Sequence, residues 1–263
     1  MEGTQKERVR QISDVEVRCA EEHIARIEVN RPPANFLDPE LIEDIVAAID
    51  WAVGQHARVV VLGTRGKHFC AGANLTARGS TGQPLDSRFY DAAARIFDSP
   101  IPIVAAVQGG AVGGGLGLAL AADFRVATPE TRFSANFARL GFHHGFGLTV
   151  TLPDVVGPQR ARELLYTGRN IRGEEAHRIG LCDRLASPEH LLTEAESLAR
   201  ELAEAAPLAV QAIRATMRPG MGDRIRDATR HELAEQRRLA ATADFKEGLR
   251  ASRDRRAPRF SGR

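Results

Sequence analysis

The chain has 263 residues, of which 43% are hydrophobic and 27% charged, the composition of a globular protein with one large domain or a core plus a helical appendage. A formal net charge of +2 gives no electrostatic case for binding nucleic acid or a membrane surface. Three scattered cysteines form neither a disulfide framework nor a metal site, so we expect no bound metal and a reducing cytoplasm as the setting.

Two segments bear on membrane association. Residues 1–10 are polar and charged, unlike a signal peptide. Residues 101–122 are apolar, but Pro102, Gln108 and a run of glycines interrupt them, which is a poor pattern for a spanning helix. We therefore expect a soluble cytoplasmic protein.

The first part of the chain alternates strand and helix patterns. Residues 24–29 alternate as in a half-buried strand, which residues 30–33 end. A helix is predicted to begin at Pro39, because Asp38 is a suitable N-cap and proline fits the first helical position. Residues 58–63 are a short apolar run between polar breaks, which is typical of a buried strand.

The same alternation continues with a helical stretch around 89–97, a second buried strand at 102–107 and a glycine-opened helix at 113–122. Strand, helix, strand and helix in this order predict an α/β fold.

The pattern changes near Pro158, after which helix follows helix, with helical apolar spacing in 191–202 and another helix starting at Pro207. Arginines in this part, spread among acidic residues, are interpreted as solvated helix faces, with a phosphate contact as the alternative. We predict an α/β core over residues 1–200 and a helical region over 201–263, docked on its own core or on a neighbouring subunit.

Two glycine-containing segments directly follow predicted strands. Residues 67–75 follow the 58–63 strand, and residues 109–117 follow the 102–107 strand. Open α/β sheets bind ligands at such strand ends, and glycine lets the backbone approach a ligand closely. Gly113–Gly115 at a helix start also present free N–H groups and the positive end of the helix dipole. Two N–H groups converging on one carbonyl oxygen would stabilise developing negative charge, by roughly 3–4 kcal/mol each.

The alternative is that the triple glycine only allows close packing of helix and strand. Other glycine motifs are excluded, because residues 109–117 contain no G-x-G-x-x-G fingerprint and the chain has neither a G-x-S-x-G elbow nor a G-x-x-x-x-G-K-[ST] phosphate loop. From these residues alone, an oxyanion hole and a purely structural role both remain open.

Several segments, from about residue 15 to the end, occur in the order of one known family. Residues 69–75 (Phe-Cys-Ala-Gly-Ala-Asn-Leu) resemble the loop F-x-A-G-A-D-L, and residues 107–123, with the triple glycine and Asp123, resemble N-G-x-x-x-G-G-G…L-x-x-x-x-D. Further matching stretches are 133–157, 166–181 and 244–260. The chain thus resembles the enoyl-CoA hydratase/isomerase (crotonase) superfamily.

This resemblance implies a crotonase-like spiral of ββα units with a helical C-terminal trimerisation region, assembled as a homotrimer or a dimer of trimers. The implied ligand is an acyl-CoA thioester, with coenzyme A as part of the substrate and no separate cofactor. By position, the oxyanion hole would be the backbone N–H groups of Ala73 and Gly114. The substrate-binding positions would be Ala34, Phe36, Ala71, Asn74 and Leu75 on the adenine and pantetheine side, together with Gly113, Phe137 and Gly145.

The sequence departs from the family pattern at the positions where the family's enzymes carry acid/base side chains. Hydratases use two glutamates; the first position is Gly117 here and the second is Phe137. Gly145 takes the place where some isomerases and dehalogenases carry an aspartate. None of these three residues can transfer a proton, so we predict feeble hydration of crotonyl-CoA.

His143 and His144 precede Gly145 in the loop at the acyl end and are the candidate bases, because histidine titrates near neutral pH. Exposed or helix-capping histidines are the alternative. Phe137 and its neighbours Phe142 and Phe146 indicate an apolar acyl pocket, or else core packing. Side chains able to hydrogen-bond an acyl group, if they do not serve packing or the surface, are Tyr90, Asn136 and Arg139.

The leading hypothesis is an acyl-CoA enzyme of the hydratase/isomerase type that stabilises a thioester enolate between Ala73 and Gly114. A first alternative is hydrolysis or carbon–carbon cleavage on the same scaffold with a histidine base. A second is a catalytically silent acyl-CoA-binding protein.

Overall fold

The computed structural model describes residues 7–19, 23–74 and 86–263. Its core is a seven-stranded sheet in the order β1-β2-β3-β4-β5-β7-β10, with β1 to β3 antiparallel and the remaining neighbours parallel. A three-stranded sheet is formed by β6, β8 and β9. The strands are β1 (Arg8–Ile12), β2 (Val15–Cys19), β3 (Ile24–Val29), β4 (Val59–Thr64), β5 (Ile103–Val107), β6 (Gly110–Val112), β7 (Phe124–Ala127), β8 (Arg132–Ser134), β9 (Asn170–Arg172) and β10 (Arg184–Leu185).

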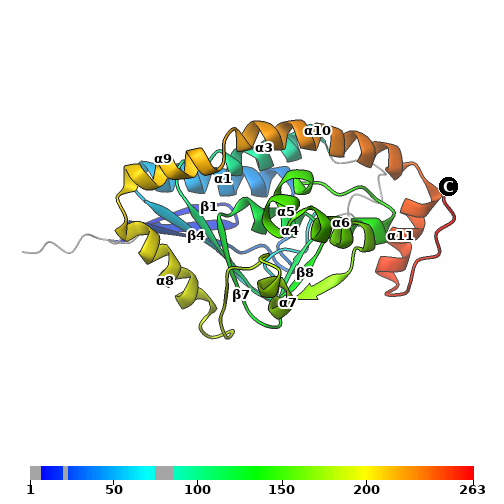
Figure 1. Ribbon diagram of the computed structural model, residues 1–263, viewed down its shortest axis with the longest axis horizontal. Coiled ribbons are helices and arrows are strands. Elements are labelled where there is room, and N and C mark those ends of the chain that lie inside the picture. The colour runs from blue at the N-terminus through cyan, green and yellow to red at the C-terminus, as the bar shows by residue number, and fades with distance from the viewer. Residues whose placement is uncertain (1–6, 20–22, 75–85) are drawn as a thin grey trace, which may run out of the picture.

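Helices cover both faces of the large sheet, which explains the continuous apolar runs of its central strands (Figure 1). In β4, Val59 and Val61 belong to the cluster with α8 (Leu191–Glu204), while Val60 and Leu62 belong to the larger core on the other face. That larger core includes α1 (Pro39–Gly54) and α3 (Ser87–Phe97). The predicted α/β class is confirmed.

The predicted elements of the first half are present. β3 has the predicted bounds, and α1 begins at Pro39 after Asp38, whose side chain accepts a hydrogen bond from the Leu41 N–H at 2.8 Å. The predicted glycine-opened helix is α4 (Gly114–Ala121), with Gly113 as its N-cap. These elements follow from local signals that the fold does not override.

The expectation of helices alone after Pro158 is wrong at two short strands, β9 and β10, which have three and two residues and are therefore too short to show a periodic pattern. Residue 200, the predicted end of the core, lies inside α8, which packs on β4, β5 and β7. The other helical elements are the 3-10 helix η1 (Asn136–Leu140), α5 (Leu148–Val156), α6 (Pro158–Thr167), α7 (Gly173–Arg178), α9 (Pro207–Met217), α10 (Met221–Ala240) and α11 (Ala243–Arg253).

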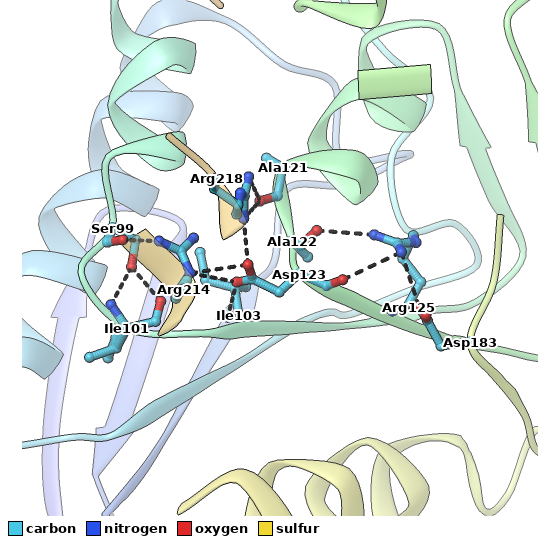
Figure 2. A network of polar contacts seen from close by, with 10 residues as sticks. All are labelled: Ser99, Ile101, Ile103, Ala121, Ala122, Asp123, Arg125, Asp183, Arg214 and Arg218. Carbon is cyan, nitrogen blue, oxygen red and sulfur yellow. Dashed lines mark hydrogen bonds and ion pairs between the residues drawn. The ribbon is translucent and has the colours of Figure 1, made fainter. Parts of the chain in front are cut away.

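Two arginines of the C-terminal region form a partly buried ion-pair cluster with Asp123 (Figure 2). Arg214 Nε lies 3.0 Å from both Asp123 carboxylate oxygens, and Arg218 Nη1 lies 2.6 Å from Oδ1. The same carboxylate accepts the Ile103 N–H at 2.9 Å. The interpretation of these arginines as solvated helix faces is therefore wrong for this pair, which fixes the end of α9 to β5.

Within the three described ranges, no helix has the length and apolar character needed to cross a membrane.

Candidate active site

Three loop segments run side by side at the ends of strands. The Cys70 N–H donates to the Gly110 carbonyl at 3.0 Å, and the Val112 N–H donates to the Cys70 carbonyl at 3.0 Å. The Leu37 N–H, from the segment before α1, donates to the Gly72 carbonyl at 2.9 Å. The two glycine-containing loops singled out in the sequence are thus neighbours in space.

The backbone N–H groups of Ala73 and Gly114 lie close together where these segments meet. A Cβ placed on Gly114 would lie 3.8 Å from the Ala73 nitrogen, and a Cβ placed on Gly72 would lie 3.3 Å from the Gly114 nitrogen. Gly114 is the first residue of α4, so its N–H has no acceptor within the helix. As far as the structure describes the chain, neither N–H donates to another protein group. Two neighbouring free donors are what an oxyanion hole requires.

The glycines of this helix start have different roles. A Cβ on Gly115 would lie 2.2 Å from the Cys70 carbonyl oxygen, so this glycine serves the close packing that the sequence left open as an alternative. Gly114 has ordinary space around it, with Leu37 Cδ1 at 3.5 Å from an added Cβ. Packing alone therefore does not explain Gly114.

A cavity of about 270 Å³ opens beside these two N–H groups, and most of its wall is apolar. The predicted site residues that line it are Phe36, Ala71, Ala73, Gly113, Gly114, Phe137 and Gly145, and the further candidates Tyr90, Asn136, Phe142 and Phe146 line it as well. The other lining residues are Gly72, Phe89, Leu140, Leu249, Ser252 and Arg253.

Other predicted residues lie elsewhere. Ala34 and Asn74 do not line the cavity; Ala34 supports it from behind, because its carbonyl accepts the Ala71 N–H at 3.0 Å. Arg139 also lies outside the lining and donates to the Thr167 carbonyl. Leu75 lies outside the described residues.

The structure does not bring His143 and His144 to the cavity wall. Their rings stack at 4.1 Å, and His144 Nε2 lies 2.9 Å from Thr149 Oγ1. Burial, followed by the charges of His143 and His231, lowers the pKa of His144 to about 3. His144 is therefore neutral at pH 7. Its side chain contacts Thr149 within the loop and does not line the cavity.

The positions that the family resemblance assigns to acids are filled by other side chains. A Cβ on Gly117 would lie 2.5 Å from Phe146 Cβ, so the Phe146 side chain occupies the space of the first glutamate. A Cβ on Gly145 would lie 2.4 Å from the Tyr90 hydroxyl oxygen. Phe137 supplies an aromatic ring beside Gly113, at 3.6 Å from an added Cβ. The three acid positions are thus rebuilt as an aromatic wall.

The loop that contains Gly145 is held from one side by α10. Glu232 accepts the N–H groups of Gly147 and Thr149 at 2.9 and 3.0 Å, and burial raises the pKa of this carboxyl while those hydrogen bonds counteract it. One helical turn later, Gln236 donates to the His143 carbonyl at 3.0 Å. Sequence reasoning missed both residues, although their spacing of four on the apolar stripe of a helix was a usable signal.

The last wall of the cavity comes from α11, which sequence reasoning also missed. Leu249, Ser252 and Arg253 of this helix line the cavity. Phe245 stacks on Phe142 with ring centroids 4.7 Å apart, which holds α11 against the loop after η1.

The described part of the chain contains no group of three His, Cys, Asp or Glu side chains placed to hold a metal ion.

Comparison with known proteins agrees with this geometry. The family model described as enoyl-CoA hydratase/isomerase matches residues 19–263. The chain belongs to the enoyl-CoA hydratase/isomerase family. Among its relatives in this family, it is 42% identical over 231 residues to "Probable enoyl-CoA hydratase EchA14" of Mycobacterium tuberculosis, which covers 85% of this chain and 89% of that protein.

Two further members of the enoyl-CoA hydratase/isomerase family show the extent of the similarity. A crotonyl-CoA hydratase of Syntrophomonas wolfei is 36% identical over 249 residues, covering 91% of this chain and 95% of that protein. The crystal structure of an enoyl-CoA hydratase/isomerase from Pseudoalteromonas atlantica matches with a TM-score of 0.82 at 28% identity, covering 95% and 100% of the two chains. The predicted family and crotonase-like fold are confirmed, and the chain is an acyl-CoA thioester enzyme of the hydratase/isomerase type.

Proposed function

We propose that the cavity holds the acyl group of an acyl-CoA thioester, and that the Ala73 and Gly114 N–H groups bind its carbonyl oxygen as enolate charge develops. The observation that carries this proposal is the pair of free, adjacent N–H groups opening on an apolar cavity. In a site that excludes water, such donors stabilise an oxyanion strongly. This chemistry needs no separate cofactor, because backbone dipoles supply the stabilisation.

The surroundings of the cavity favour enolate chemistry other than efficient hydration. No carboxylate or imidazole lines its described wall, where the titratable side chains are Tyr90 and Arg253. Activation of water by a positioned acid/base group typically contributes 10²–10⁴ in rate, so hydration of crotonyl-CoA should be feeble. The alternative of hydrolysis or carbon–carbon cleavage with a histidine base loses support, since His143 and His144 lie outside the wall.

Replacement of Gly114 by alanine tests the oxyanion hole directly. The added methyl group meets no close neighbour but lies 3.8 Å from the Ala73 nitrogen, in the space proposed for the oxyanion. Alanine keeps its N–H group, so the methyl group acts by blocking access to the donor, and the loss of one donor typically costs 10²–10³ in rate. We expect this loss in the exchange of the α-protons of butyryl-CoA with D₂O, measured by NMR, with an unchanged unfolding midpoint.

The matched control is Gly54→Ala, since Gly54 ends α1 with no atom within 4 Å of an added Cβ. Unchanged exchange in Gly114→Ala would place the hole elsewhere. Binding of butyryl-CoA without any enhanced exchange in the wild type would favour the catalytically silent alternative.

We also propose that the chain assembles as a homotrimer or a dimer of trimers through its C-terminal helices. Support comes from α9, which exposes three large apolar side chains, Leu208, Ile213 and Met217, each more than 60% exposed. Ile213 and Met217 border an apolar groove of about 480 Å³ beside the Asp123 cluster. Large exposed apolar side chains beside an apolar groove are typical of a protein interface.

A further inference from the structure

A polar pair occupies the place that the family resemblance assigns to an aspartate in some isomerases and dehalogenases. An added Cβ on Gly145 would lie 2.4 Å from the Tyr90 hydroxyl oxygen and 2.7 Å from Gln236 Nε2. Both side chains are buried, and Tyr90 lines the cavity together with Gly145. The mechanism proposed above uses neither of them.

The hydrogen bonds of Gln236 fix the direction of its amide. Its Nε2 lies 3.0 Å from the His143 carbonyl oxygen and 3.3 Å from the His144 carbonyl oxygen, and carbonyl oxygens can only accept. A flipped amide would set its oxygen against these two acceptors. The Oε1 atom is therefore the one that faces Tyr90, at 2.6 Å from the hydroxyl oxygen.

This arrangement also fixes the role of the tyrosine. Gln236 Oε1 can only accept a hydrogen bond, so the single hydroxyl hydrogen of Tyr90 is directed to it. The phenolic oxygen then offers lone pairs, and not a hydrogen, to any other partner. Donation to Gln236 polarises the hydroxyl group and makes its oxygen a better acceptor.

Aromatic rings pack around this acceptor in the described part of the cavity. Phe89 packs edge-on against Tyr90 with ring centroids 5.2 Å apart, and Phe146 and Phe137 belong to the same wall. A substrate group that faces an acceptor in such surroundings binds well if it donates a hydrogen bond and poorly if it cannot. The donor that an uncharged acyl chain carries is a hydroxyl group.

We propose that Tyr90 is a specificity-determining residue that accepts a hydrogen bond from a hydroxyl group on the acyl chain, with Gln236 as its positioning residue. The site then takes hydroxyl-bearing acyl thioesters in preference to unsubstituted ones. This inference rests on the proposed function, because it requires an acyl-CoA in the cavity.

Binding of matched thioesters to the full chain tests the proposal without any assumption about turnover. The probes are butyryl-CoA, both enantiomers of 3-hydroxybutyryl-CoA and 4-hydroxybutyryl-CoA, measured by calorimetry. At least one hydroxylated thioester should bind about tenfold more tightly than butyryl-CoA, the gain typical of one good hydrogen bond. Because the donor hydrogen is required, the methyl ether of that thioester should lose the whole gain.

The variant Tyr90→Phe keeps the aromatic ring and removes the acceptor, so it should bind the hydroxylated thioester and butyryl-CoA equally. Tyr166→Phe is the matched control, because Tyr166 is 75% exposed and lies outside the cavity; it should keep the wild-type preference. If Tyr90→Phe fails to fold, comparing how the wild type binds the hydroxylated thioester and its methyl ether still tests the proposal.

Equal wild-type binding of all four thioesters would overturn the inference and leave the proposed function standing. A hydroxyl preference that survives in Tyr90→Phe, or in the methyl ether, would also overturn it, since another lining group such as Asn136 would then read the acyl chain. Failure of every thioester to bind would overturn both proposals.

Discussion

Restoring the first hydratase glutamate should not restore hydration, because Phe146 occupies the space that this side chain needs. In Gly117→Glu, the new Cβ would lie 2.5 Å from Phe146 Cβ and 2.6 Å from its Cγ. Both atoms belong to a buried residue whose ring packs edge-on against Phe89 at 5.9 Å. The collision therefore involves the stem of a packed side chain rather than a flexible end.

The loss of folding stability expected in Gly117→Glu has two contributions. Overpacking of a core position costs about 1–3 kcal/mol. A carboxylate placed among aromatic rings without a partner adds the cost of burying its charge, so the total should be at least about 3 kcal/mol. The matched substitution Gly54→Glu, at an open surface position, should change stability by no more than about 0.5 kcal/mol.

A second substitution should relieve the first. Phe146 has a left-handed backbone with φ of 63°, which glycine adopts without strain, so Phe146→Gly removes the colliding Cβ and suits the local conformation. Phe146→Gly alone should cost about 3–5 kcal/mol, as expected for the loss of a buried phenylalanine ring. The double variant should be destabilised by about 1–3 kcal/mol less than the sum of the two single substitutions.

Urea unfolding of the four proteins in this cycle, together with crotonyl-CoA hydration, provides the measurement. Gly117→Glu should be destabilised and no more active than the wild type, whereas the double variant should hydrate crotonyl-CoA faster than either single variant. A Gly117→Glu protein as stable as the wild type would refute the steric argument. Hydration by the wild type within about tenfold of a competent hydratase would refute the argument from the absent acids.

Two further predictions concern pH and assembly. Burial lowers the folded-state pKa of His144 to about 3, so the stability that this residue contributes at pH 7 is lost as the pH falls below the unfolded value of about 6.5. By pH 5 the wild type should lose about 2 kcal/mol more than His144→Gln in urea unfolding, and equal losses would contradict the placement of His144. In sedimentation at micromolar concentration, the wild type should be a trimer or hexamer and Ile213→Arg should shift toward monomer, while a monomeric wild type would contradict the proposed interface.

Local sequence signals correctly predicted the elements that depend on interactions between residues close together in the sequence. The N-cap at Asp38, the apolar run of β4 and the glycine start of α4 each act within a few residues, and each appears in the structure. The position of Ala73 beside Gly114 was available through the resemblance, since the two loops carry the family motifs.

The remainder of the site depends on contacts between segments far apart in the chain. Tyr90 and Gln236 are separated by 146 positions, and no sequence pattern within either helix predicts their hydrogen bond. For the histidines, position next to Gly145 in the sequence does not determine the direction of a side chain. His144 Nε2 lies 2.9 Å from Thr149 Oγ1, His143 Nδ1 lies 2.8 Å from the His144 carbonyl oxygen, and neither residue is part of the cavity lining.

The wall supplied by α11 links the cavity to the order in which the chain is made. Leu249 and Arg253 come after every strand of both sheets, so a chain in which α11 has not yet docked can have its sheets complete and still lack one side of the site. A bound thioester would then favour the docked position of α11. At a concentration 100-fold above its dissociation constant, it would stabilise the docked form by about 2.7 kcal/mol over any form in which α11 has come away. Ligand binding would thus protect α11 and its connection to α10 from proteases.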